Sequence, residues 1–596
     1  MNHFKDTSHA TPIRVAQAVC VGIFIILGVA LFRLQIVKGD RYRELAENNY
    51  IVQASITAPR GMIVDRSGTV IASSRQAFSI CAIPRSFLRN REEIRTLGRI
   101  VGLDEEYIRS RLEATSSSYR PTAVIRDVDF ATLSRVEEMF ADLPDVIVIS
   151  EPVRSYPCGL QFSHMLGYVG EVTQEDLAAG KGRYGRGDFI GKTGIEKVYE
   201  EYLRGRDGER FLKFSPYGGA SPVDVDGLSA KAPRPGMTVV LNADAGLQKL
   251  GFDLLDGRRG AVVAVDPRTG GVLALVSSPG FDPNLFATGI STADWEEIMN
   301  ADGKPLLTRP IRCAYPPGSV FKIITAAAAL EGGIADKNTR YRPCAGAYRF
   351  GNRVFACWKE EGHGSRDLTD AIMVSCDVYF YQLGERLGLD RLSGYTKGWY
   401  LDAGTGIDLP GEVAGLVPDD AYYNRVYGER GWSRGVVLNL AIGQGELLLT
   451  PIEIVCFISG LANGGTYITP RCVARVESDD RAEAISGRPV ELPMAASTLG
   501  TVKEGMLAVV EGPQGTGRAA RVPGIRVAGK TGTAQNPHGD DHASFVCYAP
   551  FEEPEIVIFV MVENGGHGGA VAAPIAGELL AYYFGVSEPD EVTSAQ

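Results

Sequence analysis

The stretch Ala314–Ala326, with the sequence AYPPGSVFKIITA, constrains the chain more than any other. Two prolines and a glycine within it end any preceding regular structure, and Ser319 then precedes a run of good helix formers, Val320–Leu330. Residues three apart share one face of a helix, so the Ser319 hydroxyl and the Lys322 amine can meet. A lysine in this place can serve as the base that activates a serine nucleophile. The alternative is an ordinary helix N-cap followed by a solvated lysine.

Two further stretches favour the catalytic interpretation. Ser375-Cys376-Asp377 lies downstream of the first motif, and Lys530-Thr531-Gly532 lies far downstream of both. S-x-x-K, S-x-polar and K-T-G in this order are the signature of penicillin-interacting serine enzymes. Each motif alone can arise by chance, but three in order and widely spaced predict an acyl-transfer site.

The length and the charge of the chain exclude some classes of function. With 596 residues, of which 45% are hydrophobic and 22% charged, the chain is long enough for more than one globular domain. The net charge of -11 and the absence of a long basic run argue against nucleic acid as a partner. The ten cysteines are too sparse and too irregularly spaced to form a disulfide framework.

An apolar run lies near the start of the chain. Residues 1–14 are polar, and Val15–Phe32 carries no charge and is just long enough to span a bilayer. A signal peptide and a buried core helix are the alternatives, but no small-residue cleavage site follows and nothing amphipathic flanks the run. We therefore predict an uncleaved anchor over residues 15–33 behind a cytoplasmic tail. The flanking positive charges slightly favour the opposite orientation, so the expected orientation follows from the catalytic interpretation instead.

The first half of the remaining chain reads as a scaffold. Residues 34–230 mix strands with charged helices, expected over 89–113 and 129–143, and assemble no nucleophile with a base. Lys192-Thr193-Gly194 is a second K-T-G, but it runs into a helix instead of lying on a sheet-edge strand, so we assign it no catalytic role. The segment 231–245, which begins with KAPRPG, is the expected linker.

A second domain is expected over residues 246–586, followed by a disordered tail at 587–596. A hairpin is predicted near its start and strands near its end, with helices between them, and this order indicates an antiparallel sheet packed against helical layers. The predicted strands are 261–265, 272–276, 544–548 and 556–562, and the predicted helices include 247–255 and 572–583.

These motifs resemble those of the class B penicillin-binding proteins, and among them the elongation-type peptidoglycan D,D-transpeptidases. The likeness covers nearly the whole chain, and no glycosyltransferase domain precedes the scaffold, which argues against the bifunctional class A type. Asp377 favours the elongation type, because the division type typically carries asparagine there. Besides the apolar run, the residues that carry the likeness are Pro59-Arg60-Gly61, Asp65-Arg66, Arg154, Tyr156-Pro157, Gly191–Glu196, Tyr315–Ser319, Gly443-Gln444-Gly445, Thr450-Pro451 and Lys530–Ala534.

The resemblance implies a fold and a reaction. The expected fold is α+β: an N-terminal transmembrane helix, an elongated mixed α/β pedestal domain over 34–230, and a C-terminal transpeptidase domain with a five-stranded antiparallel sheet between helical layers. Ser319 would attack the carbonyl of the penultimate D-alanine of a donor stem peptide, and an amine of a neighbouring stem would then accept the acyl group. Lys322 in its neutral form would be the base, Ser375 would pass the proton to the leaving amine, and Asp377 would hold Lys322.

The last motif would bind the substrate. By the same resemblance, Lys530 and Thr531 would bind the carboxylate of the stem peptide or of a β-lactam. Gly532 would let the backbone approach closely. The backbone N–H groups of Ser319 and Thr533 would form the oxyanion hole.

Four residues between and within the motifs could hold a metal ion. Cys344, Cys357, His363 and Cys376 offer three thiolates and an imidazole, a complete tetrahedral set for structural zinc with no position left for water. Buried free cysteines, or a disulfide between Cys344 and Cys357, are the alternatives. Some elongation-type relatives resemble this chain in carrying a zinc site in this segment, so we predict one zinc ion that braces the second catalytic motif.

The sequence thus predicts a β-lactam-inhibited transpeptidase that cross-links peptidoglycan during elongation. It would lie in the bacterial inner membrane with most of the chain in the periplasm. By resemblance, its partners would be a membrane glycan polymerase of the SEDS type and other elongation-complex proteins. A division-type transpeptidase, a β-lactamase, a β-lactam sensor and a non-catalytic scaffold of the wall-synthesis complex are the rivals. Intact motif residues argue against the scaffold.

Overall fold

The computed structural model describes residues 10–39, 51–113, 121–180, 182–214, 220–222, 230–429, 431–536 and 539–586. The chain forms two compact units: residues 1–57, 77–151 and 207–233 in the first, and residues 58–76, 152–206 and 234–596 in the second. The expected tail 587–596 and most of the expected tail 1–14 lie outside the described residues.

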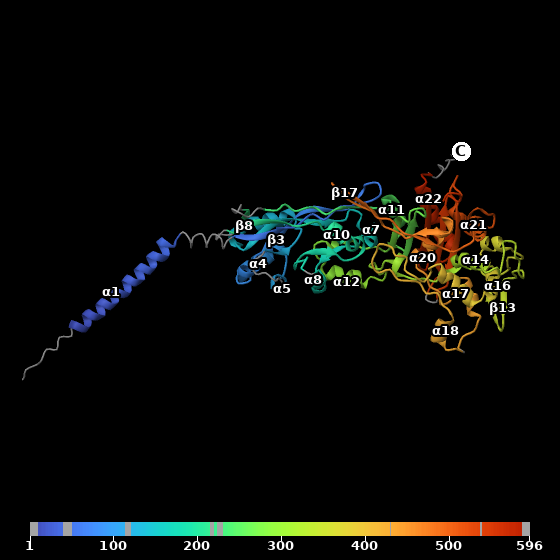
Figure 1. Cartoon of the computed structure of the whole chain (residues 1–596), viewed down its shortest axis with the longest axis horizontal. Helices are drawn as coiled ribbons and strands as arrows, with labels where there is room; N and C mark the ends of the chain where they lie inside the picture. The colour runs from blue at the N-terminus through green and yellow to red at the C-terminus, as the bar shows by residue number, and fades with distance from the viewer. Residues whose placement is uncertain are drawn as a thin grey trace, which may run out of the picture. The chain divides into compact units, whose positions relative to one another are not determined.

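Helix α1 (Ala10–Phe32) covers the predicted anchor, and a π-helical turn, η1 (Arg33–Val37), continues it (Figure 1). Arg14–Val37 is, within the part of the chain described, the one helical segment long and apolar enough to cross a membrane. Its apolar side chains are exposed in the isolated chain. This pattern fits a helix whose solvent is lipid.

The first unit combines short strands with capped helices. Strand β1 pairs antiparallel with β8, and β8 pairs with β9. The elements are β1 (Ile51–Ile56), β4 (Thr122–Ile125), β8 (Gly208–Phe214), β9 (Ala220–Pro222), α3 (Pro84–Phe87), α4 (Arg91–Val101), α5 (Glu105–Glu113), α6 (Phe130–Glu138) and η2 (Phe140–Asp142); β3 (Val70–Ala82) and β5 (Val146–Ser155) have residues in both units.

Two helices of this unit are shorter than predicted. The expected helix 89–113 is two helices, α4 and α5, because Gly102 adopts φ 72° and ends α4. The expected helix 129–143 begins at the Asp129 cap, whose side chain accepts from Thr132 N, and its α-helical part ends at Glu138. Ile94, Leu97 and Ile108 pack into the small core of this unit.

The second unit begins with elements from the expected pedestal. They are β2 (Ile63–Val64), α7 (Gly159–Leu166), β6 (Val169–Glu171), α8 (Gln174–Ala179), β7 (Phe189–Gly191), α9 (Gly194–Val198), α10 (Glu200–Leu203) and β10 (Thr238–Leu241). The helix expected directly after the second K-T-G is two short helices, α9 and α10. Strand β10 lies inside the segment expected to be a linker, where it pairs with β2 and β16 (Val473–Ser478), so part of that segment is a sheet strand.

A cluster of four charged residues stabilises this region. We call these residues the pedestal cluster: Arg60, Arg154, Glu196 and Glu200. Arg154 Nε donates to Glu196 Oε1 at 2.6 Å, and Arg60 Nη2 donates to Glu196 Oε2 and Glu200 Oε2, both at 2.7 Å. Burial raises the pKa of Glu196, but Arg154 and Arg60 outweigh burial and hold it below the usual value. Two guanidiniums and two carboxylates therefore balance one another.

The core of the second unit is a five-stranded antiparallel sheet in the order β12-β11-β21-β20-β19. Its strands are β11 (Gly260–Val265), β12 (Val272–Ser278), β19 (Ala528–Ala534), β20 (His542–Ala549) and β21 (Ile556–Val562). Helices α11 (Ala245–Leu255) and α22 (Gly568–Tyr583) lie side by side and pack on the sheet (Figure 1), and α20 (Pro451–Ala462) packs on β11, β20 and β21. The predicted α+β fold is confirmed.

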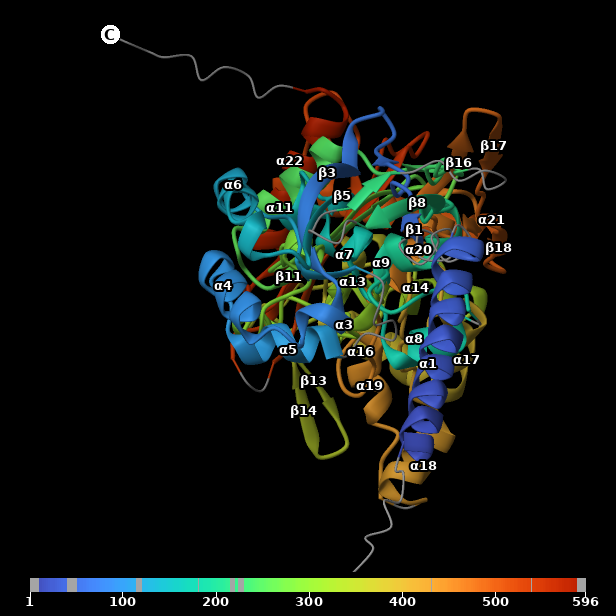
Figure 2. The ribbon, with the colours of Figure 1, turned by 90° about the vertical axis from the view of Figure 1, so that its left-hand side faces the viewer.

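The third motif, Lys530–Gly532, lies on β19 of this sheet. The first motif, with Ser319 and Lys322, and the second, which ends at Asp377, lie in a helical region. A hairpin, β13 (Ala347–Phe350) with β14 (Arg353–Ala356), and helix α18 (Asp420–Tyr427) project from it (Figure 2). The remaining elements are η3 (Pro283–Phe286), α12 (Thr292–Asn300), α13 (Arg309–Arg312), η4 (Gly318–Phe321), α14 (Lys322–Glu331), α15 (Leu368–Met373), α16 (Asp377–Leu387), α17 (Leu389–Gly398), α19 (Val436–Ala441), β15 (Thr466–Ile468), β17 (Arg481–Ala484), β18 (Pro489–Glu491), α21 (Ala496–Glu511) and η5 (Arg518–Ala520).

Candidate active site

Ser319 lies in the 3₁₀ turn η4, directly before α14, and is half-buried. We expected Ser319 to begin an α-helix; instead a tight turn precedes the α-helix, which begins at Lys322. Gly318 has φ 54°, and its N–H donates to Gly443 O at 2.9 Å. A Cβ at Gly443 would lie 2.0 Å from Gly318 O, and a Cβ at Gly318 would lie 2.6 Å from Thr533 O. Two backbone segments, at Gly443 and at Thr533, therefore close around the nucleophile turn.

Lys322 is fully buried, and its ammonium binds the second motif. Lys322 Nζ donates to Asp377 Oδ1 at 2.7 Å, to Ser375 O at 2.9 Å and to Ser375 Oγ at 3.1 Å. Asp377 is the first residue of α16, where a carboxylate suits the helix N-terminus. The second motif thus contacts Lys322 Nζ through three hydrogen bonds.

Lys530, on β19, approaches Ser375 from the sheet. Its Nζ donates to Ser375 Oγ at 2.8 Å and to Thr531 O at 2.9 Å. Burial, and next the charge of Lys322, lower the pKa of Lys530 well below its usual value, while Asp377 acts in the opposite direction. Ser375 Oγ therefore accepts from two lysines, and Ser375 itself has φ 53°, a strained conformation for a residue with a side chain.

The rest of β19 borders the nucleophile turn. Thr531 Oγ1 lies 2.8 Å from Thr516 Oγ1, and Thr533 O accepts from Gln444 Nε2 at 3.2 Å. A Cβ on Gly532 would lie 2.2 Å from Ser544 Oγ. A side chain here would press on the Ser544 hydroxyl of β20 and on Val320 of the nucleophile turn, so a glycine suits the close packing of β19.

The predicted metal ligands lie together beside the second motif. The ligand atoms of Cys344, Cys357, His363 and Cys376 lie within 4.8 Å of one another, and all four residues are buried. His363 Nδ1 is 3.5 Å from Cys357 Sγ and 3.7 Å from Cys344 Sγ. In a tetrahedral zinc site, Zn–S and Zn–N bonds of about 2.3 and 2.0 Å separate a sulfur from a nitrogen by about 3.6 Å. The residues fit a structural zinc ion.

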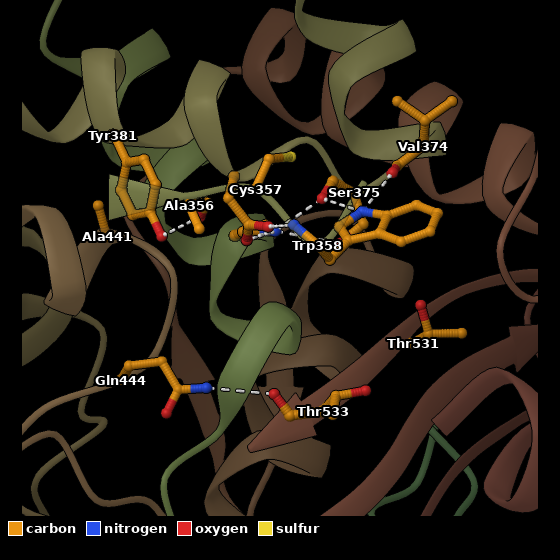
Figure 3. Close-up of polar contacts among 12 residues, drawn as sticks. Ala356, Cys357, Trp358, Val374, Ser375, Tyr381, Ala441, Gln444, Thr531 and Thr533 are labelled. Carbon is orange, nitrogen blue, oxygen red and sulfur yellow. Dashed lines mark hydrogen bonds and ion pairs between the residues drawn. The ribbon is translucent and has the colours of Figure 1, made fainter. Parts of the chain in front are cut away.

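Sequence reasoning missed three residues of the site. Trp358 binds the second motif, as Figure 3 shows, through its indole and its backbone N–H. Gln444 and Thr516 contact Thr533 and Thr531 of β19. Gln444 lies in a stretch that supported the resemblance, but no sequence pattern assigned it a contact. Trp358 follows Cys357, and that adjacency was the one available signal.

The second K-T-G is in a different setting. Lys192 follows β7 and precedes α9, and its Nζ lies 2.5 Å from Asp176 Oδ2. It is not on a strand of the five-stranded sheet, in agreement with the interpretation of its sequence context.

Comparison with known proteins agrees with this architecture. The penicillin binding protein transpeptidase domain matches residues 260–581, and the penicillin-binding protein dimerisation domain matches residues 55–241. The chain is 32% identical over 574 residues to the peptidoglycan D,D-transpeptidase MrdA of Acinetobacter baumannii, covering 92% of this chain and 84% of that protein.

Solved structures give the same result. The penicillin-binding protein PBP2 of Helicobacter pylori, in a complex with MreC, is similar with a TM-score of 0.78 and 27% identity, over 90% of this chain and 100% of that one. A chain from a structure described as "structural coordination of polymerization and crosslinking by a peptidoglycan synthase complex" is similar with a TM-score of 0.72 and 28% identity, over 98% of this chain and 100% of that one.

The sheet, the helical layers and the three converging motifs define a penicillin-binding transpeptidase. The chain belongs to the class B penicillin-binding proteins, in the penicillin-binding protein 2 group of elongation-type peptidoglycan D,D-transpeptidases. Its reaction is acyl transfer between D-Ala-D-Ala stem peptides.

Proposed function

We propose that Ser319 carries the acyl group in this reaction and that Lys322, Ser375 and Lys530 move the protons. One observation carries the proposal: Ser375 Oγ lies at hydrogen-bond distance from both lysine nitrogens, 3.1 Å from Lys322 Nζ and 2.8 Å from Lys530 Nζ. One hydroxyl therefore connects the proposed base on α14 to the substrate-binding strand. Proton relays require such contacts at hydrogen-bond distance.

In the first half-reaction, Ser319 Oγ bonds to the carbonyl carbon of the penultimate D-alanine while its proton passes to neutral Lys322 Nζ. The backbone N–H groups of Ser319 and Thr533 stabilise the oxyanion. The C–N bond then breaks, and the leaving nitrogen receives the proton through Ser375 Oγ. The terminal D-alanine departs, and an ester of Ser319 remains.

In the second half-reaction, an amine of a neighbouring stem attacks the ester carbonyl. Lys322 Nζ takes the excess proton from that amine, and the proton returns to Ser319 Oγ as the ester bond breaks. Throughout, Asp377 holds Lys322 in place. Lys530 and Thr531 bind the carboxylate end of the donor, and Gly532 lets the donor approach the backbone.

The test is the intact mass of the full-length chain after incubation with benzylpenicillin, followed by peptide mapping. We expect one stable adduct on Ser319 in the wild type and none in Ser319→Ala. Ser497→Ala, which changes an exposed serine of α21, is the matched control and should be acylated as the wild type is. An adduct that persists in Ser319→Ala would overturn the assignment.

We further propose that Cys344, Cys357, His363 and Cys376 hold one structural zinc ion. The Nδ1–Sγ distances support this proposal, and a complete ligand set leaves no position for a reacting water. When bound, the ion would hold the loop before the second motif in place. We expect about one zinc per purified chain, less in His363→Ala, and no change in Cys158→Ser. A zinc-free wild type with a Cys344–Cys357 disulfide would contradict the proposal.

We also propose that α1 is a single-pass anchor with residues 34–586 in the periplasm, comprising a pedestal over 34–230 that contacts partner proteins and a transpeptidase domain over 246–586. The complex of the Helicobacter pylori relative with MreC and the relative from a peptidoglycan synthase complex support partners of the elongation machinery, including a membrane glycan polymerase.

Two experiments test the topology and the partner. A C-terminal alkaline phosphatase fusion should be active. Replacing residues 15–33 with an unrelated membrane helix should lower co-purification of the polymerase.

A further inference from the structure

We propose that Trp358 is a positioning residue for the catalytic lysine, acting through the two groups that hold the Lys322 ammonium. This inference rests on the role proposed above for Lys322. It concerns a residue of the loop between β14 and α15 that lies outside the three sequence motifs.

Trp358 makes three hydrogen bonds to the second motif and its neighbour. Its backbone N–H donates to Asp377 Oδ2 at 2.9 Å. Its indole Nε1–H is shared between Ser375 O, at 3.0 Å, and Val374 O, at 3.2 Å (Figure 3). One residue therefore fixes both the carboxylate and the peptide group of the second motif.

These are the same groups that bind Lys322. Lys322 Nζ donates to Asp377 Oδ1 and to Ser375 O, while Trp358 donates to Asp377 Oδ2 and to Ser375 O. With one carboxylate oxygen held by Trp358, the Asp377 side chain has a fixed direction in which to present the other. Trp358 thus helps to set the position of the Lys322 nitrogen by fixing the groups that accept its hydrogen bonds.

The Ser375 peptide needs this support. With φ 53°, Ser375 adopts a left-handed conformation that a residue with a side chain does not favour by itself, and surrounding contacts must maintain it. The indole N–H provides one of these contacts directly, at the carbonyl of Ser375.

Hydrophobic burial does not fix the position of the indole, because Trp358 is 59% exposed. One of its ring contacts is with His363, at 5.2 Å between centroids, and its backbone continues directly from Cys357. The Cys/His cluster therefore sets the position from which the indole reaches the second motif.

The experiment uses the full-length chain in detergent and benzylpenicillin as the probe, with rapid quenching and intact-mass detection of the acyl-enzyme. Two variants remove the indole N–H: Trp358→Phe, and Trp358 replaced by benzothienylalanine, which keeps the shape of the ring system. Trp432→Phe is the matched control, because it also removes an indole N–H hydrogen bond, that from Trp432 Nε1 to Asn424 Oδ1 at 2.8 Å. The final amplitude gives the acylable fraction, and the concentration dependence separates the dissociation constant from the limiting acylation rate.

We expect the limiting rate to fall about tenfold in both Trp358 variants, because small displacements of a catalytic group are costly, with the dissociation constant, the final amplitude and the zinc content unchanged. Trp432→Phe should match the wild type. A lower final amplitude with a normal limiting rate would mean that Trp358 has a merely structural role. A normal limiting rate in the benzothienylalanine variant would mean that the indole N–H does not position Lys322. Either result overturns the proposal. An adduct in Ser319→Ala would instead overturn the proposed function.

Discussion

Two buried charge clusters of the second unit differ in their balance. In the pedestal cluster, Arg60 and Arg154 face Glu196 and Glu200, and the pKa of Glu196 stays below its usual value even though burial alone raises it. In the catalytic cluster, Lys322 and Lys530 share one carboxylate, Asp377, and burial together with the second ammonium lowers the pKa of Lys530.

The difference separates stabilisation from catalysis. A balanced cluster stabilises the fold as long as every partner is present, because its charges satisfy one another away from water. A cluster of two amines and one carboxylate is not balanced in this way, but the lowered pKa of Lys530 suits a site in which protons must move. The following four predictions test this contrast.

Lys322→Met should produce the largest effect. Without the proposed base, we expect the second-order rate constant for acylation by benzylpenicillin to fall about 10³-fold, equivalent to about 4 kcal/mol of activation free energy. Lys249→Met, which changes an exposed lysine on α11, is the control and should keep the wild-type rate. A loss of less than tenfold in Lys322→Met would show that another group is the base.

Glu196→Gln should be the most destabilising change in the pedestal cluster. It leaves the Arg154 guanidinium, whose side chain is 1% exposed, without its carboxylate, so the free energy of unfolding should fall by about 3 kcal/mol. Urea unfolding followed by tryptophan fluorescence measures it, because all four tryptophans lie in the second unit.

Glu504→Gln provides the comparison for that measurement, because Glu504 also lies in the second unit. Its partner Lys337 is 55% exposed, so removing this ion pair should cost much less. Equal costs for Glu196→Gln and Glu504→Gln would contradict the view that burial and balance make the pedestal cluster important. The rate of acylation of the folded Glu196→Gln protein should stay near that of the wild type.

Lys530→Met should raise stability, by less than Glu196→Gln lowers it. The pKa of Lys530 is lower in the folded than in the unfolded chain, so between the two values the unfolded chain binds more protons and stability rises with pH. The gain from removing the amine should therefore be larger at pH 7 than at pH 10. Melting curves at both values measure it, and a gain independent of pH would refute the explanation.

Lys192→Ala should produce the smallest effect. Lys192 and Asp176 form a partly exposed ion pair, with side chains 20% and 28% exposed, so less than about 1 kcal/mol of stability should be lost. Acylation by benzylpenicillin should be unchanged. A substantial loss of acylation would mean that the second K-T-G takes part in the function after all.

Much of the fold and site could be predicted because ordered motifs and periodic patterns are local. The hairpin β11–β12, the last two strands and the α+β fold follow from such patterns. The break between α4 and α5 was missed because it depends on the left-handed conformation of one glycine, Gly102. The β10 strand was missed because a proline-rich start suggested a linker, while its pairing partners β2 and β16 lie far away in the sequence.

Prediction of the catalytic site was limited in the same way: residues in motifs could be named, but contacts made in the folded chain could not. Ser319, Lys322, Ser375, Asp377 and Lys530 were named from their motifs. The structure brings the last four into hydrogen-bond contact and places Ser319 in the turn directly before α14. Trp358 and Gln444 act through contacts with backbone carbonyls, which any sequence offers at every residue, so no pattern of residue types marks them. The positive φ of Ser375 is likewise imposed by tertiary contacts and not by the residue itself.

The close packing of the backbone at Gly443 and Thr533 on Gly318 of the nucleophile turn has a consequence for drug resistance. At Gly443 a side chain would overlap a backbone carbonyl, and at Gly318 it would approach one within 2.6 Å, both at positive φ. Backbone carbonyls cannot be removed by substitution, so neither glycine can readily mutate while the turn keeps its shape. An inhibitor anchored on the backbone of this turn would therefore contact a surface that a population of bacteria has few ways to alter, and escape would have to begin at more distant side chains.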